Sequence, residues 1–159
     1  MTFLRLDFLN KLGFTLITCY LLQWLVPFEV DRLHELQTND DYKFWSGLAL
    51  ATLFASQWTL TYARVVLQRE GRAFIKVVKA HKIVGSLSPI LYYTHSCDPG
   101  YGFLFVLTFI FIINHIIANI NLDGLTLTMY NVWLWIHIFF SFVILILAIS
   151  HIVIVFQFK

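Results

Sequence analysis

Long apolar segments alternate with short polar ones along the chain. Five mostly apolar stretches are separated by segments that hold most of the charged side chains. A helix crosses the hydrocarbon core of a bilayer with about 20 apolar residues, at about 1.5 Å rise per residue. The five predicted spans cover residues 8–28, 44–67, 74–95, 101–120 and 132–156. The pattern therefore predicts an all-α integral membrane protein, a helical bundle of about five transmembrane helices.

Turn residues stand at the breaks between these spans. Pro27 closes the first span, and residues 98–100 (Asp-Pro-Gly) follow the third. Residues 121–124 (Asn-Leu-Asp-Gly) separate the fourth span from the fifth. Pro, Gly and Asn are the usual residues of such turns. Because no linker, internal repeat or low-complexity segment is present, residues 1–159 are predicted to form one transmembrane domain.

The composition excludes several classes of protein. Hydrophobic residues make up 59% of the chain and charged residues 13%, against about 45–50% and about 25% in soluble domains. A net charge of +2 leaves little positive charge for a phosphate backbone, so a nucleic-acid partner is not expected. The two cysteines are too few for a disulfide scaffold.

The charges predict an orientation, because Lys and Arg collect on the cytoplasmic side of a membrane. The predicted loop between the second and third spans holds Arg64, Arg69, Arg72, Lys76 and Lys79, against Glu70. The segment between the first and second spans is acidic and holds Glu29, Asp31, Glu35, Asp40 and Asp41, against Arg32 and Lys43. We therefore expect a cytoplasmic N-terminus and an outer C-terminus. We expect the bacterial inner membrane as the location and membrane lipid as a partner.

Histidines carry most of the candidate chemistry. Of the six, His34 lies in the acidic outer segment, where we expect it to be solvated. The others fall within or at the edge of predicted spans: His81, His95, His115, His137 and His151. Ionisable residues inside a membrane are costly and indicate a functional site.

Four of these histidines form two matched pairs. His81 and His95 are 14 residues apart on the third span, and His137 and His151 are 14 apart on the fifth. Fourteen residues turn a helix to about 40° short of four full turns and rise about 21 Å, so each pair shares one face. The two spans run in the same direction. Equal depth then pairs His81 with His137 on the inner side and His95 with His151 on the outer side.

Two imidazoles that face each other across a helix gap are the ligands of a bis-histidine haem. The spacing therefore predicts two haems, with their irons bound by the four paired histidines. No Cys-x-x-Cys-His motif is present, so we expect haem b without covalent attachment.

Small and basic side chains lie near the predicted ligands. Gly85 and Ser88 follow His81 by four and seven residues, and Ser141 follows His137 by four. They leave room for a flat macrocycle, although small residues also serve close helix packing. Three lysines lie within one or two turns of His81, and one of them is a candidate partner for a haem propionate. They equally satisfy the positive-inside rule and contact with anionic lipid. These are Lys76, Lys79 and Lys82.

His115, near the inner end of the fourth span, has three interpretations. It could hydrogen-bond a helix or a haem propionate. It could line a quinone pocket near the inner haem. It could also replace one of the four paired histidines as a haem ligand.

The stretch from Lys79 through His81 and Gly85 to His95 resembles the third span of the ferric reductase-like transmembrane superfamily. This superfamily includes NADPH oxidases, ferric reductases and the haem-binding membrane subunit of the bacterial methionine sulfoxide reductase system. The resemblance covers residues 74–157. It implies two histidines on each of the third and fifth spans, which bind two haems b, one on each side of the membrane. A typical member has six spans, and here five are predicted.

The sequence predicts a membrane di-haem cytochrome b that transfers electrons across the bilayer. No glycine-rich nucleotide motif is present, so electrons are expected from quinol or from a flavin or iron–sulfur partner. We therefore expect an electron-transfer subunit of an oxidoreductase complex, with other redox subunits as partners. The alternative is a non-redox membrane scaffold or a proton-relay subunit that uses its buried histidines. The second to fifth spans carry no carboxylate at depth, which disfavours a proton carrier.

Overall fold

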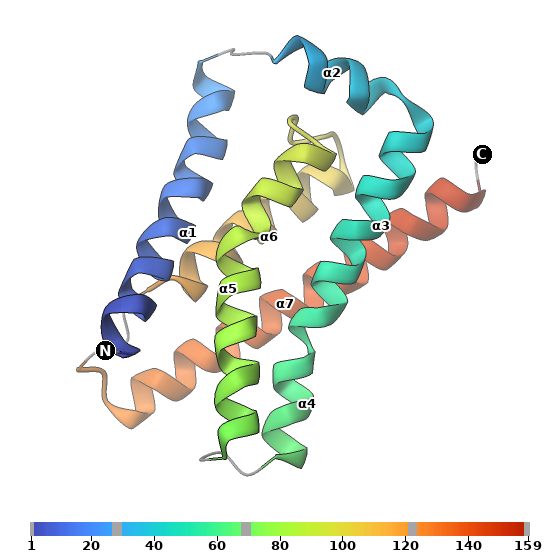
Figure 1. Cartoon of the computed structure of the whole chain (residues 1–159). Helices are drawn as coiled ribbons and strands as arrows, with labels where there is room; N and C mark the ends of the chain where they lie inside the picture. Colours follow the sequence, from blue (N-terminus) through green and yellow to red (C-terminus); the bar gives the residue numbers. More distant parts are fainter. Residues whose placement is uncertain (1, 27–29, 68–70, 121–123, 158–159) are drawn as a thin grey trace. The chain divides into compact units, whose positions relative to one another are not determined.

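The computed structural model describes residues 2–26, 30–67, 71–120 and 124–157, with side chains from residue 8 onward. Within these ranges the chain is all-α (Figure 1). It divides into two compact units, Met1–Cys97 and Asp98–Lys159. Several residues used above lie outside the described ranges: Pro27, Glu29, Arg69, Glu70 and residues 121–123.

The first unit is built around one long helix. Its elements are α1 (Thr2–Leu25), α2 (Asp31–Thr38), α3 (Asp40–Gln57), α4 (Thr59–Val66) and α5 (Arg72–His95). Helix α5 packs against α1 on one side and against α3 and α4 on the other (Figure 1). Helices α1 and α5 run in the same direction, and the ring of Tyr20 meets that of Tyr92 at 5.8 Å. Helix α3 runs in the opposite direction to α5, so the start of α3 meets the end of α5.

The short helix α2 connects α1 to α3 and contacts the end of α5. Gln37 Nε2 donates to the carbonyl of Tyr93 at 2.8 Å and to that of Thr94 at 3.1 Å. These carbonyls belong to the last turn of α5, where no helical N–H group reaches them. Gln37 thus joins α2 to the end of α5. The Sγ–H of Cys97, which follows α5, donates to Gln37 Oε1 at 2.9 Å.

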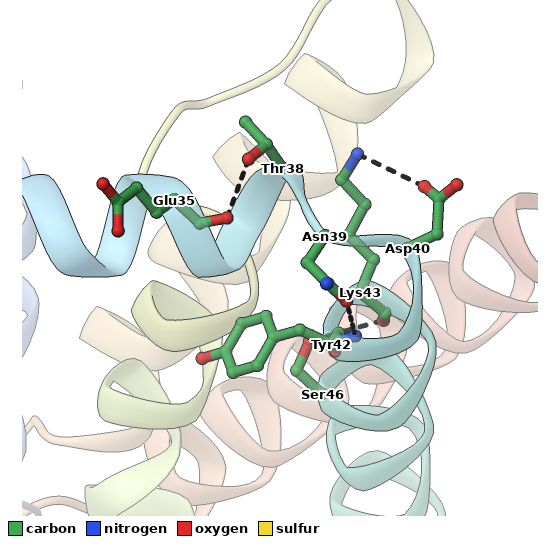
Figure 2. A network of polar contacts seen from close by, with 7 residues as sticks. All are labelled: Glu35, Thr38, Asn39, Asp40, Tyr42, Lys43 and Ser46. Atoms are coloured by element: carbon green, nitrogen blue, oxygen red, sulfur yellow. Dashed lines mark hydrogen bonds and ion pairs between the residues drawn. The ribbon is translucent and has the colours of Figure 1, made fainter.

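Side chains at the α2–α3 junction define the start of α3 (Figure 2). Asn39 is the N-cap residue, and its Oδ1 accepts from the backbone N–H of Tyr42 at 3.0 Å. Asn at this position pairs one of the donors that the first helical turn leaves unsatisfied. One turn further on, Ser46 Oγ donates to the carbonyl of Tyr42 at 2.7 Å. This places the hydroxyl of Ser46 close to the end of α5.

The second predicted span is interrupted, because residues 44–67 are divided between α3 and α4 at Trp58. The N–H of Trp58 donates to the carbonyls of Ala55 and Ser56, which are closer in sequence than the partner of a regular helix. Thr59 Oγ1 also donates to Ser56 O at 2.7 Å. Ser and Thr side chains of this kind compete with the helical ladder for backbone groups. The interruption ends α3 one residue before Trp58, at Gln57.

The second unit consists of α6 (Phe103–Ala118) and α7 (Leu127–Gln157), which pack against each other. Gly100 and Gly102 precede α6 with φ of 75° and 58°. Glycine is the residue that adopts this left-handed region without steric cost. The predicted Asp-Pro-Gly turn falls in this non-helical segment between α5 and α6, where the chain bends at Asp98.

Each of the five predicted spans is helical, with different ends. The fourth is shorter than predicted, since α6 has 16 residues and is about 24 Å long. The fifth is longer, since α7 has 31 residues and reaches about 46 Å, against a hydrocarbon thickness of about 30 Å. Within the described residues, α7 is the one helix long and apolar enough to cross a membrane, and α6 is a shorter apolar helix. The five-span arrangement stays a prediction.

Four of the basic residues assigned to the loop between the second and third spans lie on helices instead. Arg64 belongs to α4, and Arg72, Lys76 and Lys79 belong to the first two turns of α5. The acidic segment is also partly helical, because Asp31 and Glu35 belong to α2. His34 lies on the same helix, and its side chain is exposed.

Candidate functional site

Each predicted histidine pair lies on one continuous helix. His81 and His95 belong to α5, and His137 and His151 belong to α7. Both pairs therefore keep the helical spacing of about 21 Å along the axis. The described contacts of each histidine side chain are with residues of its own unit. The pairing of α5 histidines with α7 histidines therefore stays a prediction.

His81 is hydrogen-bonded to the end of α3. Its Nδ1 lies 3.1 Å from the carbonyl oxygen of Gln57, the last residue of α3. A carbonyl oxygen only accepts, so Nδ1 carries the proton and donates it. In a neutral imidazole the lone pair then resides on Nε2. The interruption of the helix at Trp58 thus supplies the acceptor that fixes the tautomer of His81.

His95, the last residue of α5, is held by the first turns of α3. Its Nδ1 lies 3.0 Å from Ser46 Oγ. The shortest contact of the Ser46 hydroxyl is with the carbonyl of Tyr42 at 2.7 Å, and the carbonyl of Lys43 lies at 3.3 Å. With the hydroxyl proton directed to either carbonyl, Oγ accepts from the imidazole and His95 donates from Nδ1. Its ring lies against Gly47, where an added Cβ would be 3.0 Å from Cε1 of His95.

His137 belongs to a closed hydrogen-bond network between α6 and α7. Its Nδ1 donates to Asn114 Oδ1 at 2.9 Å. Asn114 Nδ2 donates to Ser141 Oγ at 3.0 Å, and Ser141 Oγ donates to the carbonyl of His137 at 2.8 Å. An amide oxygen only accepts, so the contact with Asn114 Oδ1 places the proton of His137 on Nδ1, the same tautomer as that of His81 and His95.

An indole ring restrains the orientation of His137. Trp133 lies one turn earlier on α7, and its ring is stacked on the imidazole with centroids 5.8 Å apart and planes 8° apart. The Nε1–H of Trp133 donates to the carbonyl of Ile117 on α6 at 2.8 Å. The imidazole plane is thus set by a hydrogen bond at Nδ1 and by a stacked ring.

The other histidines have different surroundings. The ring of His151 lies 6.3 Å from that of Phe103 at the start of α6. His115 is buried on α6, with its ring 5.9 Å from that of Phe111. The backbone carbonyl of His115 accepts from Asn119 Nδ2 at 2.8 Å. His115 and His137 belong to the same unit.

The small residues near the predicted ligands have specific contacts. Gly85 faces the side chain of Gln57, whose Oε1 would lie 3.5 Å from an added Cβ. Ser88 is buried and donates to the carbonyl of Gly85 at 2.7 Å. Ser141, which the sequence indicates only as a small residue, is a member of the His137 network. Of the three lysines on α5, Lys76 and Lys79 are exposed and Lys82 is half-buried.

Several residues of this site have no role in the prediction from sequence. They are Ser46, Gly47, Gln57, Asn114 and Trp133. Asn114 offers a signal, since it is an amide within an apolar stretch and buried amides need partners. The carbonyl of Gln57 offers none, because its role depends on where α3 ends.

Comparison of the chain with protein-family models, with curated proteins and with solved structures gives no match.

Proposed function

We propose that the chain is a membrane di-haem b-type cytochrome subunit that transfers electrons across a bilayer. In this proposal a donor on one side, a quinol or a flavin or iron–sulfur partner, supplies electrons to an acceptor on the other. His81 and His137 hold one haem, and His95 and His151 hold the other. The location is a membrane, with a cytoplasmic N-terminus.

One shared feature of the predicted ligands carries this proposal. His81, His95 and His137 each donate from Nδ1 to an oxygen, respectively the carbonyl of Gln57, Ser46 Oγ and Asn114 Oδ1. Metal-ligating histidines generally donate their second ring N–H to such an acceptor, which fixes the tautomer and raises ligand basicity. Three separate acceptors produce the same tautomer, with the lone pair on Nε2. This is the tautomer that axial ligation through Nε2 needs.

The chain's own residues would bind the haems and set their surroundings. Haem b supplies a one-electron change between ferric and ferrous iron when it is bound. The imidazoles hold the iron, and Gln57, Ser46 and Asn114 orient them. Apolar helices exclude water from the site, and low solvent access together with axial ligation tunes the potential.

The surface of α7 supports a membrane location. Exposed side chains along this helix are large and apolar, for example Trp135 (70% exposed), Phe139 (61%) and Ile149 (52%). Asp, Glu, Lys and Arg are absent from residues 127–157. A contiguous apolar surface of this kind is rare on soluble proteins and suits contact with lipid.

Spectroscopy of the purified full-length chain tests the proposed function. The protein in detergent should show sharp low-spin b-type bands in a reduced-minus-oxidised spectrum. A pyridine haemochrome assay should count two haems per chain. A protein that stays colourless when haem is supplied during expression would contradict the proposal.

Gly47 provides a second prediction, because a methyl group at this position would crowd His95. An alanine Cβ would lie 3.0 Å from Cε1 of the imidazole, closer than ordinary van der Waals contact. Overpacking of a well-packed site costs about 1–3 kcal/mol. Gly47→Ala should therefore weaken retention of one haem, measured as its rate of transfer to apomyoglobin. Leu48→Ala is the control, because Leu48 is the next residue of α3 and its side chain is 48% exposed. Equal rates for the two variants would contradict the prediction.

A further inference from the structure

Helix α1 carries two buried polar atoms that stand apart from the hydrogen-bond network of the first unit. Asn10 Oδ1 and Trp24 Nε1 are enclosed and have no hydrogen-bond partner within the described part of the chain. Buried donors and acceptors are nearly always paired, because an unpaired one has lost its hydrogen bonds to water and gained none in the protein. An enclosed indole N–H without an acceptor therefore points to a group that binds there.

Both residues belong to the face of α1 that packs on α5. The positions of this face follow a repeat of three and four residues: Asn10, Gly13, Ile17, Tyr20 and Trp24. Ile17 and Tyr20, in the middle, are 1% and 3% exposed. This face of α1 is therefore closely packed at its centre, and it carries the two unpaired polar atoms at its ends.

The two polar ends lie at the levels of the two histidines of α5. Asn10 and Trp24 are 14 residues apart, the same separation as His81 and His95. Helices α1 and α5 run in the same direction, and the ring of Tyr20 meets that of Tyr92 with centroids 5.8 Å apart. From this contact, Trp24 lies about 6 Å further along α1 and Asn10 about 15 Å back. On α5, His95 lies about 4.5 Å beyond Tyr92 and His81 about 16.5 Å before it. Each of the two polar residues is therefore within one helical turn of the level of one histidine.

We propose that Trp24 and Asn10 hydrogen-bond the propionate carboxylates of the two haems, Trp24 at the level of His95 and Asn10 at the level of His81. This inference rests on the proposed function. Carboxylates are the strong acceptors at the edge of haem b. An indole N–H is a donor only, so it requires such an acceptor. A half-turn of the Asn10 amide presents its NH₂ group in place of Oδ1, so Asn10 donates in the same way.

A conservative substitution removes the donor and keeps the ring. Trp24→Phe should lower the midpoint potential of one haem, because a propionate without its donor carries more uncompensated negative charge and favours ferric iron. Loss of a hydrogen bond to a charged group should also speed haem loss about tenfold or more. Trp45→Phe is the control, since Trp45 is 65% exposed on α3 of the same unit. It should leave both potentials and the rate of haem loss unchanged.

Combining Trp24→Phe with a histidine variant shows which of the two haems Trp24 contacts. In His81→Ala, where only the His95 haem stays low-spin, Trp24→Phe should still shift the remaining potential. In His95→Ala it should have no effect, and Asn10→Ala should show the reverse pattern. Circular dichroism checks that each variant is folded, and the propionate bands in the resonance Raman spectrum of the unsubstituted protein report the hydrogen bond independently.

The outcomes separate this inference from the proposed function. If the unsubstituted chain binds two haems but Trp24→Phe behaves like Trp45→Phe, the inference is overturned and the cytochrome stands. If the unsubstituted chain binds no haem, both fail.

Discussion

The double variant His81→Ala/His137→Ala should retain one low-spin haem per chain, while His81→Ala/His151→Ala should retain none. Each single alanine variant removes one axial imidazole and so abolishes one bis-histidine haem. If His81 and His137 bind the same iron, their combined loss costs no more than either loss alone. If His81 and His151 serve different irons, their combined loss removes both. Integrated low-spin signals in electron paramagnetic resonance, set against total haem, measure the count.

Two further variants complete this design. His34→Ala removes an exposed imidazole on α2 and should leave both low-spin haems. His115→Ala separates the interpretations of the buried histidine on α6, because a ligand would cost one low-spin haem and a hydrogen-bonding residue would not. A reversed pattern, with one haem left in His81→Ala/His151→Ala and none in His81→Ala/His137→Ala, would contradict the predicted pairing.

The sequence predicts the helices well because hydrophobic length is a strong signal. All five apolar stretches are helical, and the Asp-Pro-Gly residues lie in the non-helical segment before α6, with Gly100 at a φ of 75°. The interruption at Trp58 is not predicted, because it depends on hydroxyl groups of the helix itself. The hydroxyl of Thr59 donates to the carbonyl of Ser56 and so competes with the backbone hydrogen bonds of the helix. A hydropathy pattern does not show this competition, because the residues on both sides are largely apolar.

The candidate site is predicted only in part, because spacing identifies a histidine and not its partner. The interval of 14 residues depends on α5 and α7 each being continuous, and both are. The acceptors at Nδ1 come from three different sources: a backbone carbonyl, a hydroxyl and an amide. No single sequence motif describes all three. They are brought to the histidines by packing of α3 on α5 and of α6 on α7.

Asn114 provides the sharpest test of these partners. Replacing it with leucine should weaken haem binding about 10–100-fold, the usual cost of losing the hydrogen-bond partner of a metal-ligating histidine. Leucine keeps the size of the side chain but leaves the Nδ1–H of His137 without its acceptor and removes the N–H that Ser141 Oγ accepts. An unsatisfied buried donor costs about 1–3 kcal/mol. Titration of the haem-free protein with haem measures the affinity.

A second substitution at the same position gives the opposite electrostatic change. Asn114→Asp keeps an oxygen acceptor for Nδ1 and makes it anionic, so it raises the basicity of His137 and stabilises ferric iron. It should retain haem and lower the midpoint potential of one haem only. Asn119→Leu is the matched control at the end of the same helix, because the amide of Asn119 donates to the backbone carbonyl of His115 at 2.8 Å. If Asn114→Leu and Asn119→Leu weaken haem binding equally, Asn114 stabilises α6 rather than orienting His137. The hydrogen bond from His137 Nδ1 to Asn114 would then no longer support the proposed function.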